Sequence, residues 1–271
     1  MSDVVQGEGL VGLTEIESAG RRLAGVAVPT PLLPADAVTE ACGAAEVRLK
    51  CENLQRAGSF KIRGAYNFVS QLSDDQVGAG IITYSSGNHA QAVALAGKLR
   101  GLRVVVVMPT TAPKVKRDGA ERLGAQVYYE GTTSVERRAL AEEIAAKEGL
   151  VIVPPFDHRH IIAGQGTVGL EIARDWDDVD LVLAPIGGGG LASGVAAAVK
   201  RMIPHASVIG VEPEGAASMR KALELSITTA PALTAAGANS RVRDAPALNR
   251  AISMPLKESW VSSSTASCSP L

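Results

Sequence analysis

The sequence predicts a layered α/β protein built on mostly parallel sheets. Segments with strand character alternate with segments of helical apolar spacing from about residue 46 to residue 211. The apolar run Arg103–Met108 is typical of a strand buried on both faces of a parallel sheet, and Leu181–Ile186 is predicted to be a buried strand. The helical segments between the strands supply the right-handed crossovers that such a sheet needs.

The chain begins with a predicted helix, Thr14–Gly25. Thr14 can cap it, Glu15 suits the positive end of the helix dipole, and Arg22 suits the negative end. The proline-rich segment Pro29–Leu32 cannot continue a helix and is expected to be extended.

Strands and helices then follow in turn. The predicted strands are Glu46–Cys51, Gly80–Tyr84, Arg103–Met108, Gln126–Tyr129, Val151–Val153, Leu181–Ile186 and Ser207–Val211. The predicted helices are Ile62–Leu72, Ala90–Leu99, Pro113–Leu123, Ser134–Glu148, Thr167–Asp175 and Leu191–Arg201. Ligand-binding loops of such sheets lie at the carboxyl ends of the strands, so these loops carry the functional signal.

Composition narrows the class of function. The 271 residues are 46% apolar and 20% charged, with a net charge of −1, so neither nucleic acid nor an acidic membrane surface is an expected partner. The chain has no apolar run long enough to span a membrane and no signal peptide in residues 1–30. Cys42, Cys51 and Cys268 form neither a disulfide framework nor a zinc motif. We expect a cytoplasmic enzyme whose partners are small molecules or further copies of itself.

Lys61 is the first candidate for chemistry. Gly58 and Ser59 precede it and favour a tight turn, and Phe60 places an aromatic ring beside it. A lysine amine becomes a nucleophile when its pKa is lowered or when it forms an imine. Taken alone, the same residues also fit a solvated lysine at the start of an amphipathic helix.

Four glycines, Gly187–Gly190, lie between a predicted strand and a predicted helix. Their backbone N–H groups can cradle a phosphate, which the helix dipole also favours. A tight turn alone does not require four glycines, because each one costs backbone entropy. A dinucleotide site is the competing interpretation, since Gly187, Gly189 and Ala192 fit its fingerprint and Glu212 ends the next strand.

Two further loops carry polar residues. Ser85–His89 offers hydroxyls, an amide and free N–H groups before a helix, although a simple helix cap would need only one such residue. The other loop is predicted to contain Pro155–His158 and Gly164–Thr167. His158 and His160 lack a third metal ligand and are interpreted as ordinary loop histidines.

Taken together, these segments resemble a known family. The matching motifs, in chain order, are Glu52-Asn53-Leu54-Gln55, Gly58-Ser59-Phe60-Lys61-Ile62-Arg63-Gly64-Ala65, Ser85-Ser86-Gly87-Asn88-His89-Ala90-Gln91, Met108-Pro109, Gly164-Gln165-Gly166-Thr167 and the glycine loop. From about Thr14 to Ala230 the chain resembles the fold-type II pyridoxal-phosphate enzymes, in the threonine/serine dehydratase branch that includes serine racemase.

The resemblance implies a two-domain fold like that of the tryptophan synthase β chain, in which each domain is an open, mostly parallel sheet flanked by helices. Residues 1–79 and 156–234 would form a discontinuous large domain that binds pyridoxal 5'-phosphate. Residues 80–155 would form a small domain. Residues 235–271 are expected to be an atypical and poorly ordered tail, because they have no sustained periodicity.

The resemblance also assigns site residues. Lys61 would hold the cofactor as a Schiff base, with Phe60 beside the ring and Asn88 bonded to the ring hydroxyl. Residues that would bind the phosphate are Gly187, Gly188, Gly189, Gly190 and Leu191. Residues that would surround the substrate carboxylate are Ser85, Ser86, Gly87 and His89. Lys61 and Ser86 would be catalytic, with Ser86 at the position of a second proton donor in racemases.

The implied reaction is dehydration and deamination of L-threonine or L-serine to 2-oxobutanoate or pyruvate and ammonia, as in isoleucine biosynthesis. Alternatives are a serine or hydroxyaspartate racemase on the same scaffold, and a non-catalytic protein that binds pyridoxal phosphate or a nucleotide. Family analogy implies a homodimer or a higher homo-oligomer.

The chain departs from the family pattern in two places. Glu212 matches an acidic residue near which family members can hold a divalent cation, but the second acid is replaced by Ser218, so no metal is expected. After Leu233 neither the glycine segment beside the ring nor the residue that bonds its nitrogen is recognisable, and Cys268 has the wrong setting. We therefore expect that residues 235–271 are an out-of-frame or truncated end, which would weaken turnover.

Overall fold

The computed structural model describes residues 10–217 and 219–222. These residues fall into two units, of which residues 35–47 form one and the chain on either side forms the other. The smaller unit contains helix α2 (Asp36–Cys42), which ends at Gly43 with φ 67°. Sequence analysis missed this helix, although a glycine just after a helix is a common stop signal.

A four-stranded parallel sheet is the centre of the larger unit. Its strands lie in the order β5 (Gln126–Tyr129), β4 (Val104–Met108), β3 (Ile81–Tyr84) and β6 (Val151–Ile152). All three strand pairings are parallel, as the alternation of strands and helices predicts. Every residue of β4 is buried, which confirms the expectation from its apolar run.

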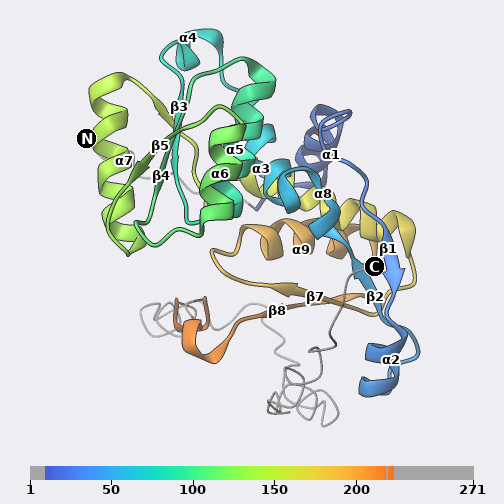
Figure 1. Ribbon diagram of the computed structural model, residues 1–271. Helices are drawn as coiled ribbons and strands as arrows, with labels where there is room; N and C mark the ends of the chain where they lie inside the picture. Colours follow the sequence, from blue (N-terminus) through green and yellow to red (C-terminus); the bar gives the residue numbers. More distant parts are fainter. Residues whose placement is uncertain (1–9, 218, 223–271) are drawn as a thin grey trace, which may run out of the picture. The chain divides into compact units, whose positions relative to one another are not determined.

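Helices cover both faces of this sheet. Figure 1 shows α7 (Ser134–Glu148) on one side, and α5 (Asn88–Arg100) and α6 (Lys114–Arg122) on the other. Side chains of β3 alternate between the faces: Ile82 packs in the α7 core and Ile81 in the α5 core. The carboxyl ends of the strands are thereby left at one edge, where loops can carry ligands.

A second group of elements surrounds helix α8 (Arg159–Asp175). It contacts α1 (Leu13–Arg22), α3 (Lys61–Val69) and α9 (Gly190–Met202). Strands β7 (Leu181–Pro185) and β8 (Ser207–Val211) pair in parallel beside α9. The prediction that β7 is a buried strand is wrong, because its residues alternate between buried and more exposed positions and Leu183 is 59% exposed. Strands β1 (Leu32–Pro34) and β2 (Arg48–Lys50) pair antiparallel. The short helix α4 (Asp74–Val77), which sequence analysis missed, precedes β3.

The predicted loop over Gly164–Thr167 is wrong, because these residues form the middle of α8. Their glycines serve close helix packing. A Cβ at Gly164 would collide with the carbonyl oxygen of Arg63 on α3, and one at Gly166 would lie 3.0 Å from the carbonyl oxygen of Gly194 on α9. Because glycine has no side chain, α3 and α9 can approach α8 closely at these positions. The stabilisation from this packing outweighs the low helix propensity of glycine.

The predicted cap of the first helix is also wrong by two residues. Helix α1 begins at Leu13 with Gly12 as its N-cap, so Thr14 lies inside the first turn. The carboxylate of Glu15 accepts a hydrogen bond from the Gly12 N–H at 2.9 Å and takes the role expected of Thr14. Among the described helices, none is both long enough and apolar enough to cross a bilayer.

Candidate active site

Lys61 begins helix α3 directly after the predicted turn. Residues 56–58 form a 3-10 turn, in which Ala57 has φ 59° and Gly58 has φ 71°. Ala57 is the one non-glycine residue of the described chain with a positive φ, and such strain often accompanies functional sites. The Nζ atom of Lys61 donates a hydrogen bond to the carbonyl oxygen of Pro155, at 2.7 Å.

Burial makes Lys61 a weaker base than an ordinary lysine. Removal from water disfavours the charged amine and lowers the pKa of Lys61 from 10.5 to about 8. A substantial fraction of the amine is therefore neutral near pH 8, as a nucleophile or a proton acceptor requires. This property separates Lys61 from the solvated lysine considered as an alternative.

Lys61 faces a cavity of about 130 Å³. The residues lining it are Phe60, Lys61, Pro155, Phe156, Gln165, Pro185, Gly187, Gly188, Gly189, Gly190 and Leu191. The lysine, its neighbouring aromatic ring and the glycine loop, which starts 126 residues after Lys61, thus line one cavity. The centre of the Phe60 ring lies 5.5 Å from Nζ of Lys61.

The glycine loop is held against Phe156. A Cβ at Gly188 would overlap the Phe156 ring, and one at Gly190 would lie 2.9 Å from the Phe156 carbonyl oxygen. Gly189 has φ 84° and turns the chain into α9. Because the first N–H groups of a helix have no partner within it, they present donors and a positive dipole end to an anion. A phosphate group fits these features beside the Lys61 amine.

The segment Ser85–His89 follows β3 and starts α5, but it does not line this cavity. Ser86 and Asn88 are exposed, and Oδ1 of Asn88 accepts a hydrogen bond from Nζ of Lys116 at 2.5 Å. The Gly87 N–H bonds the Ser85 hydroxyl at 3.2 Å.

His89 contacts the segment Val153–Pro155, whose Pro155 carbonyl oxygen accepts the hydrogen bond from Lys61. Its Nε2 lies 3.3 Å from the carbonyl oxygen of Val153, two residues before Pro155, and Thr83 donates to the same oxygen at 2.8 Å. Since a carbonyl only accepts, Nε2 carries the proton, and the buried Nδ1 has no partner among the described residues. Burial lowers the pKa of His89 to about 3, and the charge of Lys61 adds to this effect.

The metal and nucleotide alternatives gain no support from the described residues. His158 caps α8, and its Nδ1 accepts a hydrogen bond from the His160 N–H at 3.1 Å. Glu212 accepts hydrogen bonds from the N–H groups of Met219 and Arg220, at 2.9 and 3.0 Å. No group of three possible metal ligands occurs in the described part of the chain. Ser218, Cys268 and the tail 235–271 lie outside the described residues.

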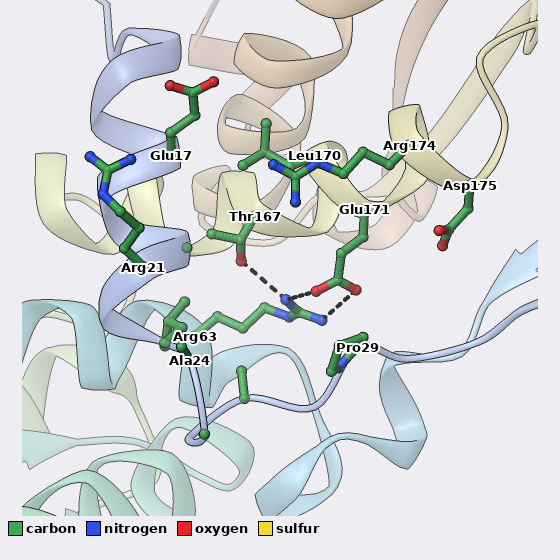
Figure 2. A pocket seen from close by; sticks show the side chains of 14 residues that line it. Glu17, Arg21, Ala24, Pro29, Arg63, Thr167, Leu170, Glu171, Arg174 and Asp175 are labelled. Atoms are coloured by element: carbon green, nitrogen blue, oxygen red, sulfur yellow. Dashed lines mark hydrogen bonds and ion pairs between the residues drawn. The ribbon is translucent and has the colours of Figure 1, made fainter.

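Sequence analysis missed a cluster of ion pairs around Arg63, close to Lys61 in the sequence. Arg63, two residues along α3, has a side chain only 1% exposed and pairs with Glu52 at 2.7 Å and Glu171 at 2.6 Å. Figure 2 shows its guanidinium group between Thr167 and Glu171 of α8, at the border of a cavity of about 740 Å³. Lys50 also pairs with Glu171, at 2.8 Å.

This cluster fixes the lysine-bearing end of α3 to α8. Burial alone would raise the pKa of Glu171, but the hydrogen bond and charge of Arg63 lower it, so the pair is ionised. The signal that could have revealed this cluster is the pair of opposite charges Glu52 and Arg63, which lie 11 residues apart in two of the family motifs. Sequence alone does not show that both side chains are largely buried.

Comparison with known proteins agrees with this arrangement. The sequence matches the family described as "Pyridoxal-phosphate dependent enzyme" over residues 23–258. It is 47% identical over 210 residues to an L-threonine ammonia-lyase of Thermotoga maritima, covering 78% of this chain and 52% of that protein. It is 42% identical over 231 residues to a serine racemase of Schizosaccharomyces pombe, covering 84% of this chain and 71% of that protein.

A solved structure shows the same likeness. Maize serine racemase superposes with a TM-score of 0.77 at 35% identity, covering 80% of this chain and 66% of the maize chain. This chain therefore spans about half to two thirds of the length of several of the proteins that it resembles.

Proposed function

Because the chain belongs to the family of pyridoxal-phosphate dependent enzymes, we propose that it catalyses the dehydration and deamination of L-threonine and L-serine. The products would be 2-oxobutanoate or pyruvate together with ammonia. The observation that carries the proposal is the partly neutral Lys61 amine, which shares a small cavity with a glycine-rich helix start. The relatives named threonine ammonia-lyase support the choice of reaction.

The residues around the cavity can hold the cofactor in a defined orientation. We assign the phosphate to the N–H groups of Gly187, Gly188, Gly189, Gly190 and Leu191. The fit is supported by the Gly188 contact with Phe156, which leaves no room for a side chain in the cradle. Lys61 would bond the cofactor aldehyde, and Phe60 would lie beside the ring. When bound, pyridoxal phosphate supplies the electron sink for the negative charge that develops at the substrate α-carbon.

Lys61 would also move the reacting proton. With substrate bound, Nζ of Lys61 would accept the α-proton, for which a pKa of about 8 is well suited near neutral pH. In the net reaction the substrate would lose its β-hydroxyl group as one water and consume one water on release of ammonia, so atoms balance without an oxidant. Neutral His89 adds no positive charge next to the amine.

The segment after β3 would bind the substrate. Ser85, Ser86, Gly87 and His89 stand at the start of α5, where N–H groups can receive the substrate carboxylate. Asn88 would bond the ring hydroxyl through its amide N–H, since its Oδ1 is taken by Lys116.

Racemisation of serine is the second candidate. Ser86 is exposed at the carboxyl end of β3 and could return a proton to the α-carbon from another direction than Lys61. The relative named serine racemase in S. pombe favours this alternative. Chiral analysis of recovered serine separates the two reactions.

The proposal extends to organisation. We assign residues 1–79 and 156–234 to a large domain and 80–155 to a small one, a division supported by the four-stranded sheet, which lies wholly within 80–155. We also propose a homo-oligomer in the cytoplasm, by analogy with the family, and the net charge of −1 supports the absence of a nucleic-acid or acidic-membrane partner.

The test is formation of 2-oxobutanoate from L-threonine by the purified protein with added pyridoxal phosphate. Lys61→Ala should abolish product, whereas Lys98→Ala, which changes an exposed lysine of α5, should not. Cofactor bound at Lys61 without any product from threonine or serine would instead favour the non-catalytic binding protein.

A further inference from the structure

Gln165 is a buried polar residue with an unused acceptor. It lies in the middle of α8 with a side chain only 1% exposed, and its Oε1 has no hydrogen-bond partner among the described residues. A buried, unpaired amide oxygen costs free energy, so its retention needs a reason.

Its position relative to Lys61 suggests that reason. Gln165 and Lys61 both line the cavity of about 130 Å³. Gly64 on α3 makes room for the Gln165 amide, because a Cβ there would lie 2.5 Å from Nε2. The close approach of α3 and α8 at Gly164 therefore brings the amide to the wall that carries the lysine.

Lys61 has N–H donors that could bond the unused acceptor of Gln165. An ammonium group has three N–H donors, and among the described residues Lys61 uses one, to the Pro155 carbonyl. A lysine side chain has four rotatable carbons, so its Nζ can reach a neighbouring acceptor without backbone movement.

We propose that Gln165 is a positioning residue, whose Oε1 accepts a hydrogen bond from the protonated Nζ of Lys61. Pro155 O and Gln165 Oε1 then hold the ammonium between them. In the proposed function this is the state in which Lys61 has taken the substrate α-proton, and the two acceptors keep that proton beside the reacting carbon. The inference rests on the proposed function only for this last consequence.

The test measures the titration of Lys61 in cofactor-free protein. The protein is produced with lysine ¹³C-labelled at Cε, which leaves the three N–H donors intact, and the signal lost in Lys61→Ala is followed by NMR against pH. Gln165→Leu removes an acceptor for the charged form and should lower the midpoint by about one pH unit. Gln165→Glu adds a negative charge at the same place and should raise it by about one unit or more.

A matched control makes the same chemical change elsewhere. Gln71, just beyond α3, bonds the Asn67 carbonyl oxygen at 2.6 Å and does not line the cavity. Gln71→Glu should leave the Lys61 midpoint where it is. Gln165→Leu keeps the proposal testable if the buried carboxylate of Gln165→Glu prevents folding, because leucine needs no partner.

The outcomes are distinct from those of the proposed function. Equal midpoints in wild type and Gln165→Leu would overturn the role of Gln165, even if threonine is turned over. Shifted midpoints in a protein that forms no product would support the contact and refute only the reaction.

Discussion

Gly188 packs against the side chain of Phe156, so closely that a Cβ at Gly188 would overlap the aromatic ring. This contact joins the glycine loop after β7 to the segment after β6, which also provides the Pro155 carbonyl for Lys61. Two segments some 30 residues apart thus form one wall of the cavity, and the first prediction tests their fit.

Gly188→Ala should weaken binding of pyridoxal phosphate roughly tenfold or more, since overpacking costs about 1–3 kcal/mol. Fluorescence or absorbance titration with the cofactor measures the loss. Gly187→Ala, in the same loop, adds a Cβ that meets nothing within 4 Å, so its effect should be much smaller. Equal effects of the two substitutions would contradict the contact with Phe156.

Arg63→Met should destabilise the protein by about 3–5 kcal/mol, because it leaves the carboxylates of Glu52 and Glu171 without their buried partner. Urea unfolding followed by circular dichroism gives the value. Arg138→Met, which breaks only the exposed pair with Glu142, should leave the unfolding midpoint unchanged. A similar midpoint for Arg63→Met and wild type would show that the cluster does not hold α3 to α8.

His89 should make stability depend on pH. Its pKa is about 3 in the folded protein against an ordinary 6.5, so between these values the unfolded chain binds the proton and the folded chain does not. Stability is therefore lost as the pH falls from 6.5 toward 3, by up to about 1.4 kcal/mol per unit.

His89→Gln removes this titrating group. As the pH falls from 6.5 toward 3, wild type should therefore lose more free energy of unfolding than the variant does. His205→Gln, which changes an exposed histidine, is measured beside it as the matched substitution. A curve for His89→Gln that runs parallel to wild type would mean that His89 is not buried as a neutral group.

The rate of covalent binding of pyridoxal phosphate should depend on the fraction of Lys61 that is deprotonated. With a pKa of about 8 instead of 10.5, the amine loses its proton as the pH rises through 8, and the initial rate of bonding should increase through the same range. Stopped-flow absorbance at several pH values measures the midpoint. A rate still rising steeply at pH 10 would show that the amine is solvated.

Sequence patterns predicted the layered fold because its signals are local. The helix over Ser134–Glu148 and the strands Gln126–Tyr129 and Ser207–Val211 match their predicted bounds, since caps, turns and apolar spacing all lie in the segment itself. Gly164–Thr167 was misplaced because its glycines are explained by neighbouring helices, which a local pattern does not contain.

The roles assigned to the site residues stay predictions, but part of their grouping could be predicted for the same reason. Lys61 and the glycine loop have recognisable local motifs, and the cavity unites them. Gln165 and Pro155 gain their importance only from distances across the fold, such as the 2.7 Å between the Pro155 oxygen and Lys61 Nζ. Burial of Arg63 likewise depends on the contact of α3 with α8.

The most direct test of the account is the site of covalent cofactor attachment. The protein is incubated with pyridoxal phosphate, reduced with borohydride, digested and mapped by mass spectrometry, alongside Lys61→Ala. We expect one dominant modified residue, Lys61, and loss of the absorbance at about 410 nm in the variant. Modification spread over exposed lysines, or an unchanged absorbance in Lys61→Ala, would contradict it.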